Sequence, residues 1–227
     1  MPSFHQTMPS LVWSEVETVL LDLDGTLLDL QFDNTFWHEL VPRAYAQKEG
    51  IPLGEAKAKL FGWYRTYRGQ LAWYCLDHWS ELLGLELAEL KRRVRHGVRL
   101  LPHARRFLEG LLRHRKRLYL VTNAHPKTLE IKLQQVDLRP YFEKIVTSHH
   151  LGAAKETGAF WRRLAEEIPY LPERTLMVDD SLPVLEAARE AGVRYLVAVR
   201  QPSSSAPPQE TAPFPALEDL EPLPSRS

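Results

Sequence analysis

Acidic side chains follow two apolar runs that lie far apart in the chain. Asp22 and Asp24 come at the end of one run, and Asp179 and Asp180 come at the end of the other. Carboxylates placed directly after buried strands are unfavourable unless they bind a metal ion or are hydrogen-bonded. Carboxylate oxygens suit Mg²⁺, a hard cation that usually keeps several of its waters. The two acidic pairs therefore predict one shared Mg²⁺ site, with all four residues as candidate ligands.

Hydrogen-bond donors and a lysine follow other predicted strands in the same pattern. Thr122 and Asn123 end another apolar run, where a hydroxyl and an amide can donate hydrogen bonds to phosphate oxygens. A predicted helix begins at Pro126 and adds free N–H groups and a positive dipole end. Lys155 precedes a further helix and could neutralise a phosphate and a nearby carboxylate. Lys144 is an alternative to Lys155, but it begins a strand-like run.

Short apolar runs rich in Val and Leu predict strands that are buried on both faces. Helical patterns alternate with them, which predicts an α/β, Rossmann-like core with a parallel sheet covered on both sides. Ligands bind beyond the carboxyl ends of such strands, where the polar residues named above fall. The predicted strands are 17–22, 117–122, 144–147, 175–179 and 194–199, and the predicted helices are 102–113, 126–136, 158–168 and 182–191.

The segment 31–99 breaks this alternation, because its apolar residues recur at helical spacing and Gly50 and Gly84 provide helix stops. We predict that 14–30 and 100–200 form the core domain and that 31–99 is an all-helical insert. Most aromatic side chains of the insert are expected in its own core, although some could stack on a base. These side chains are Phe36, Trp37, Trp63, Tyr64, Trp73, Tyr74 and Trp79.

The Pro- and Ser-rich segment 201–227 is expected to bury too little apolar surface to offset its ordering entropy. It is predicted to be a mobile tail or one laid loosely on the core. The basic runs 91–99 and 113–117 are interpreted as solvated helix faces.

The balance of 29 Lys and Arg residues against 29 Asp and Glu residues argues against nucleic acid or an anionic membrane as a partner. No run has the length of a membrane span, and the N-terminus lacks the charged start of a signal peptide, so a cytoplasmic location is expected. The single cysteine, Cys75, is expected to be a small packed residue. His149 and His150 are adjacent and face different ways, so we do not interpret them as a metal pair. His125 could touch a substrate.

In their order and placement, these motifs resemble the four motifs of haloacid dehalogenase-type phosphatases. They are the run DLDGT at 22–26, the pair at 122–123, the lysine at 155 and the pair at 179–180, and the resemblance covers about 16–199. It implies a fold of that type and a Mg²⁺-dependent phosphatase. It also implies that Asp22 is the nucleophile that forms an aspartyl-phosphate. Asp24 would be the general acid and base, and its backbone carbonyl would be a metal ligand. Two acids spaced in this way favour phosphoryl transfer over dehalogenation, which needs no acid for the leaving group.

The resemblance implies further roles for the other motif residues. Thr122 would bind the phosphate, and Lys155 would steady the nucleophile and the phosphoryl group. Asp180 would bind the metal, and Asp179 would be either a supporting ligand or a group that orients the ligands. The family's fourth motif usually carries a further acid, and Val184 stands at its position in this sequence. Metal binding by this motif would therefore depend on Asp179 and Asp180.

Stretches around the motifs and in the insert are similar to the GMP/IMP 5′-nucleotidase subgroup. They include WSEVETVLLDLDGTLLDLQFDN, LAWYCLDHWSELLGL and TNAHP. This resemblance implies a C1-type cap at 31–99 and a small phosphorylated substrate, a purine nucleoside 5′-monophosphate. Gln31, Asp33 and Asn34 would lie near the site mouth. Alternatives are a phosphatase for phosphoglycolate or sugar phosphates, a phosphomutase, and a non-catalytic binding protein.

Overall fold

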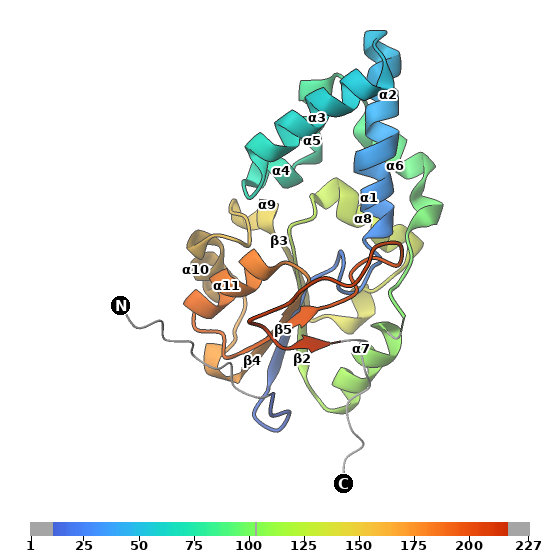
Figure 1. Ribbon diagram of the computed structural model, residues 1–227. Helices are drawn as coiled ribbons and strands as arrows, with labels where there is room; N and C mark the ends of the chain where they lie inside the picture. Colours follow the sequence, from blue (N-terminus) through green and yellow to red (C-terminus); the bar gives the residue numbers. More distant parts are fainter. Residues whose placement is uncertain (1–10, 103, 218–227) are drawn as a thin grey trace.

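A six-stranded parallel sheet forms the centre of the molecule, and an all-helical insert stands beyond its carboxyl edge (Figure 1). The computed structural model describes residues 11–102 and 104–217. The strand order is β3-β2-β1-β4-β5-β6, and every neighbouring pair is parallel. The strands are β1 (Thr18–Leu21), β2 (Arg117–Thr122), β3 (Lys144–Thr147), β4 (Thr175–Asp179), β5 (Tyr195–Val199) and β6 (Ala216–Leu217).

Helices cover both faces of the sheet, which explains why its strands read as continuous apolar runs. Alternate residues of β1 enter different cores: Val19 and Leu21 pack with residues of α7 and α8, and Leu20 packs with residues of α10 and α11. The core helices are α7 (Ala104–Arg113), α8 (Pro126–Gln135), α9 (Ser148–Leu151), α10 (Gly158–Glu167) and α11 (Leu182–Glu190), with short 3₁₀ helices η3 (Arg139–Tyr141) and η4 (Pro172–Arg174).

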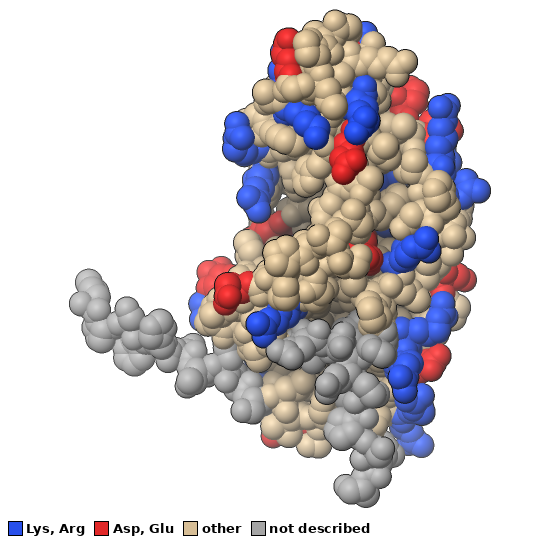
Figure 2. Space-filling view, turned by 45° about the vertical axis from the view of Figure 1, so that its right-hand side comes forward, with Lys and Arg blue, Asp and Glu red and all other residues tan. Residues whose placement is uncertain are grey.

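The insert leaves and re-enters the core through a narrow neck, where Leu28 and Leu100 form an antiparallel bridge. It has a core of its own, in which Phe36, Tyr64 and Trp79 are buried. Figure 2 shows it as an upper lobe above the core, with a hollow between the two lobes on one side. Its elements are α1 (Gln31–Thr35), the π-helix η1 (Phe36–Leu40), α2 (Val41–Glu49), α3 (Leu53–Tyr67), α4 (Leu71–Tyr74), α5 (Leu76–Leu83), α6 (Leu87–Arg93) and the 3₁₀ helix η2 (Arg95–Gly97).

The C-terminal segment 201–217 differs from the prediction of a mobile or loosely attached tail. Phe214 is only 4% exposed and packs in the core beside α10 and α11. Residues 216–217 add β6 to the sheet, and the amide of Gln209 donates to the backbone oxygens of Asp180 and Val199. This polar segment is therefore held against the core by Phe214, by the pairing of β6 and by the side chain of Gln209. The rest of the predicted tail, 218–227, lies outside the described residues.

The α/β fold class with a parallel sheet is confirmed, and the five predicted strands occur within two residues of their expected bounds. The solvated helix face predicted for 91–99 is wrong for Lys91, whose side chain is 1% exposed. Among the described residues, none of the helices combines the length and the apolar character that crossing a membrane requires. The expectation about a signal peptide concerns the first ten residues, which lie outside the described part of the chain.

Candidate active site

Three carboxylates meet at the carboxyl edge of the sheet. Asp22 follows β1, Asp179 ends β4, and Asp180 follows it. Because β1 and β4 are paired in parallel, their ends lie side by side. One oxygen of each carboxylate lies within 4.8 Å of the oxygens of the other two. This set of hard oxygen donors fits a divalent cation such as Mg²⁺.

The electrostatics of this acid cluster also fit a cation. Burial raises the pKa of Asp22 to about 6, Lys155 opposes the shift and Asp179 adds to it. Burial and the nearby charges of Asp179 and Asp22 raise the pKa of Asp180 well above its usual value. Burial is the largest cause of both shifts, and the repulsion between the neighbouring carboxylates adds to it. A divalent cation among the three carboxylates would relieve that repulsion.

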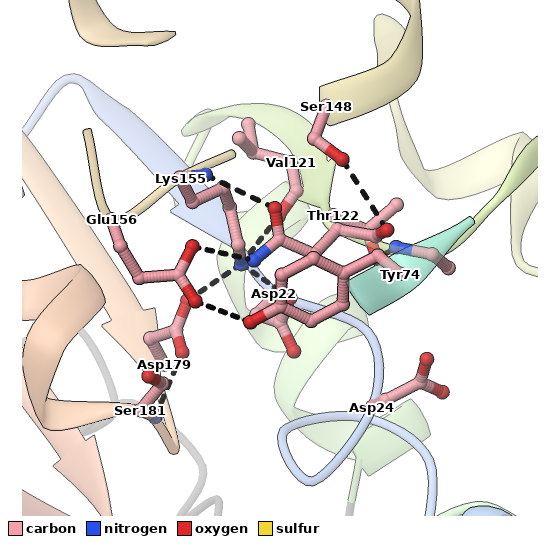
Figure 3. Close-up of polar contacts among 12 residues, drawn as sticks. Asp22, Asp24, Tyr74, Val121, Thr122, Ser148, Lys155, Glu156, Asp179 and Ser181 are labelled. Carbon is pink, nitrogen blue, oxygen red and sulfur yellow. Dashed lines mark hydrogen bonds and ion pairs between the residues drawn. The ribbon is translucent and has the colours of Figure 1, made fainter. Parts of the chain in front are cut away.

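Lys155 holds two of the carboxylates in place (Figure 3). Its ammonium group is buried and lies 2.5 Å from Asp22 Oδ1 and 2.7 Å from Asp179 Oδ2. It also donates to the carbonyl of Val121. Burial alone would lower the pKa of Lys155, but the two carboxylates outweigh burial and raise it. The alternative, Lys144, is exposed and pairs with Glu167 on the surface.

Asn123 organises the loop that carries Lys155. Its side-chain oxygen accepts a hydrogen bond of 3.0 Å from the backbone N–H of Lys155, and its amide group donates to Glu156. One N–H of the amide is thus occupied by the protein itself, and the phosphate contact expected from Asn123 stays a prediction. Thr122 is buried, and its hydroxyl oxygen accepts from the N–H of Ala124, which leaves the hydroxyl proton free for an acceptor beyond β2.

Asp24 belongs to a different network from Asp22, although only one residue separates them. The side chain of Asp24 is set apart from the group around Lys155 in Figure 3 and accepts from Lys132 at 2.6 Å. Lys132 also pairs with Asp33 of the insert, which in turn binds Lys91 at 2.8 Å. Both lysine side chains are 1% exposed. This chain of charges joins the core to the base of the insert.

The pKa of Asp24 is raised to about 6. Burial is the largest cause, Lys132 opposes it, and Asp33 and then Asp22 add to it. Burial therefore provides most of the rise in the pKa of Asp24, and the charge of Asp22 is a smaller contribution. Burial would also raise the pKa of Asp33, but Lys132 and Lys91 outweigh burial and hold it well below its usual range.

Several residues of this region were missed by sequence reasoning. Lys132 lies three positions after Leu129 and four after Thr128, on the buried face of α8, and a lysine at that position was the available signal. Tyr74 was expected only as an insert aromatic, yet its hydroxyl donates to Glu156 of the core. Nothing in the local sequence marks Glu156 as its partner.

The remaining candidate residues lie elsewhere or are already occupied. Gln31 donates to Thr35 and accepts from Ser203, whereas Asp33 is held by its two lysines. Asn34 is half-buried in α1. Val184 is 1% exposed in the core, so the residue at the position of the family's later acid contributes only packing.

The parallel sheet with its carboxylates at the carboxyl edge is the arrangement of α/β enzymes that bind ligands beyond their strand ends. The model of the haloacid dehalogenase-like hydrolases matches residues 16–192, and the chain belongs to this family. It is 39% identical to the GMP/IMP nucleotidase YrfG of Escherichia coli over 92% of this chain and 95% of that protein. It is 25% identical to a phosphorylated carbohydrates phosphatase of Thermotoga maritima over 81% of this chain and 85% of that one.

Two solved structures share the fold. A phosphatase of this family from Thermococcus onnurineus has a TM-score of 0.76 at 24% identity, over 90% of this chain and 94% of that one. The magnesium-bound hydrolase YfnB from Bacillus subtilis has a TM-score of 0.62 at 24% identity, over 90% of this chain and 95% of that one. The similarity extends over both the sheet and the insert, because each alignment covers nine-tenths of the chain.

Proposed function

We propose that this phosphoric monoester hydrolase is Mg²⁺-dependent and acts through an aspartyl-phosphate on Asp22. The main support for this proposal is the set of contacts around the Asp22 carboxylate. Its carboxylate is held by Lys155 at 2.5 Å and lies within 4.8 Å of the carboxylates of Asp179 and Asp180. A carboxylate that attacks a phosphate dianion meets like-charge repulsion, which a lysine and a cation relieve.

The chain's own residues divide the reaction into two displacements. An oxygen of Asp22 attacks phosphorus and the leaving alcohol departs; water then attacks phosphorus and regenerates the carboxylate. Lys155 steadies the nucleophile and the phosphoryl oxygens, and the free hydroxyl proton of Thr122 can be donated to one of those oxygens. Asp22, Asp179, Asp180 and the backbone carbonyl of Asp24 would hold Mg²⁺, which would neutralise the charge of the carboxylates and of the phosphoryl group.

Asp24 is the general acid and base of the proposal. A pKa of about 6 supports this role, because a carboxyl group that titrates near neutral pH can both give and take a proton. Its contact with Lys132 favours the charged form, which suits the second displacement, when Asp24 takes a proton from water. The protonated form required in the first displacement would need that contact to loosen.

The proposed substrates are purine nucleoside 5′-monophosphates, GMP and IMP. The similarity to the Escherichia coli nucleotidase supports this class, because it extends over nearly the full length of both proteins. The insert would act as a cap that covers the site and selects the leaving nucleoside. The carbohydrate phosphatase relative supports sugar phosphates as the second candidate class.

A phosphate-release assay with saturating Mg²⁺ tests the proposal. We expect kcat/KM for GMP and IMP to exceed that for phosphoglycolate and a hexose phosphate by at least about tenfold, and chelation to abolish turnover. Free phosphate should appear without a bisphosphate activator, which a phosphomutase would require. Equal rates on all substrates would remove the nucleotidase proposal, and full activity in excess chelator would remove the magnesium mechanism.

A further inference from the structure

Three side chains with soft or borderline donor atoms converge where the insert meets the core. Cys75 lies between α4 and α5 of the insert, His125 immediately precedes α8, and His149 lies in α9. One donor atom of each, the cysteine sulfur and one ring nitrogen per histidine, lies within 4.8 Å of the other two. The two rings meet edge to face, with 4.7 Å between their centroids. The cluster is distinct from the acid cluster, since the two share no residue.

His149 has a buried ring nitrogen with no hydrogen-bond partner, Nε2. The hydroxyl of Ser148 donates to the carbonyl of Asn123, and its oxygen lies 3.4 Å from the other ring nitrogen, Nδ1. The Ser148 oxygen is therefore available to accept from a protonated Nδ1. This tautomer leaves the lone pair of Nε2 free, which is how a partner of one imidazole nitrogen prepares the other to bind a metal.

Asp77 lies beside His125, outside the group of three, and its carboxylate would supply a fourth donor. The His125 ring is buried, and its Nε2 lies 3.8 Å from Asp77 Oδ2. Its Nδ1 accepts a long hydrogen bond of 3.3 Å from the N–H of Lys127. Metal binding through Nε2 would move the ring proton to Nδ1 and break this hydrogen bond. Burial lowers the pKa of both histidines, to about 4 for His149, which supports neutral rings near pH 7.

We propose that Cys75, His125 and His149 bind Zn²⁺, with Asp77 as the fourth ligand, and that the ion ties the insert to the core. A thiolate with two imidazoles and a carboxylate is a donor set typical of zinc and unsuited to Mg²⁺. Cys75 loses its thiol proton to solvent when the metal binds. The Lys127–Asp77 pair, at 2.7 Å, and the Tyr74–Glu156 contact cross the same interface.

The ion would inhibit turnover, because a cap must separate from its core to admit substrate and release product. This consequence rests on the proposed function, whereas binding of the ion does not. The insert contributes Cys75 and Asp77, and the core contributes both histidines, so the bound metal would oppose that separation. Inhibition by Zn²⁺ should therefore persist when Mg²⁺ saturates the acid cluster.

Cobalt absorption tests the binding directly. We expect Co²⁺, added to Mg²⁺-saturated protein, to give a thiolate-to-cobalt charge-transfer band that Zn²⁺ removes. Because Cys75 is the sole cysteine of the sequence, the band can come from no other residue. Cys75→Ser should abolish it, and His149→Gln should weaken cobalt affinity by at least about tenfold. His150→Gln is the matched control, because His150 is an exposed neighbour paired with Glu167, and it should leave the band unchanged.

Alkylation of the wild-type thiol provides a measurement that needs no variant. Zn²⁺ should slow modification of Cys75 at least about tenfold, followed by intact mass, and Mg²⁺ should not. Absence of the cobalt band from the wild type at saturating metal, or an equal band in Cys75→Ser, would overturn the proposal. These readouts use no substrate, so they decide the metal site even if the nucleotidase proposal fails. Zinc inhibition, measured relative to each protein's own zinc-free rate, should be lost in Cys75→Ser and kept in His150→Gln.

Discussion

The two acids of the first motif, Asp22 and Asp24, are bound by different buried lysines. Lys155 binds Asp22 together with Asp179, and Lys132 binds Asp24 together with Asp33. Two carboxylates that are close in sequence therefore sit in different electrostatic surroundings. Such a separation is what allows one carboxylate to act as a nucleophile and the other as an acid and base.

Asp22→Asn should abolish turnover while it stabilises the metal-free protein. We expect phosphate release to fall by at least about 10³-fold, because an amide is not a competent nucleophile. Burial raises the pKa of Asp22 from 3.8 to about 6, so its ionised form destabilises the fold above that pH. In chelator at pH 7.5, the variant should gain about 2–3 kcal/mol in urea unfolding.

The pH dependence of this gain provides the check. A group whose pKa is raised in the folded state is least unfavourable when protonated, so the gain should shrink as the pH falls from about 6 and vanish near 4. The comparison between variant and wild type cancels the histidines that titrate in the same range. A variant that is less stable than the wild type at pH 7.5 in chelator would contradict the assigned electrostatics.

Lys132→Met should cost much more stability than the matched change Lys127→Met on the same helix. Loss of the buried Lys132 leaves Asp24 and Asp33 without their shared cation, which costs about 3–5 kcal/mol. Lys127 is exposed, and its single pair with Asp77 should contribute less than about 1 kcal/mol. Urea unfolding of both variants measures the difference, and similar losses would show that the buried network contributes little.

At the scale of elements, the turn after β1 sets how closely the two acidic strand ends approach. Gly25 has a φ of +82°, and a Cβ atom built on it would lie 2.6 Å from Oδ2 of Asp180. The absent side chain is therefore what lets the Asp180 carboxylate lie against this turn. The turn also redirects the chain toward the neck of the insert.

Gly25→Ala should destabilise the protein by at least about 1 kcal/mol and weaken Mg²⁺ affinity, because it strains the turn and displaces Asp180. Gly62→Ala, in the interior of α3, is the control: its added Cβ meets no atom within 4 Å. That change should stabilise the helix by about 0.5–1 kcal/mol. Urea unfolding with and without Mg²⁺ measures both effects, and unchanged metal affinity in Gly25→Ala would contradict this account of the turn.

At the scale of the whole molecule, the C-terminal segment connects parts that the sheet alone does not. The backbone oxygen of Pro202 accepts from the N–H of Leu30 at the base of the insert. Gln209 binds the backbone oxygen of Asp180 in the acid cluster, and Phe214 fills a place in the core. The segment thus braces the insert, the site and the edge of the sheet together.

Phe214→Ala tests whether the docked C-terminal segment contributes to the free energy of unfolding. Removing a buried aromatic side chain should cost about 3 kcal/mol in urea unfolding. Leu171→Ala removes an apolar side chain that is 52% exposed, and it should change stability by less than about 0.5 kcal/mol. If both variants unfold like the wild type, the segment does not contribute to the folded core.

The sequence by itself determined the alternation of strands and helices, the helical insert and the placement of the acids at strand ends. These features are local, because apolar periodicity and the residue after each strand can be read without knowing what lies opposite. The docking of the segment around Phe214 could not be predicted in this way, because its composition is that of a tail and its contacts are with distant parts of the core.

Only the tertiary structure decided which side chains of the site contact one another. Lys155, Lys132, Glu156 and the cluster around Cys75 each pair with residues far away in the chain, and the chemistry of a lysine or a histidine is set by those neighbours. The neighbours follow from the strand order and from the position of the insert over the sheet. Residue type and spacing therefore predicted where the chemistry lies, and the packing of distant segments decided which side chains share it.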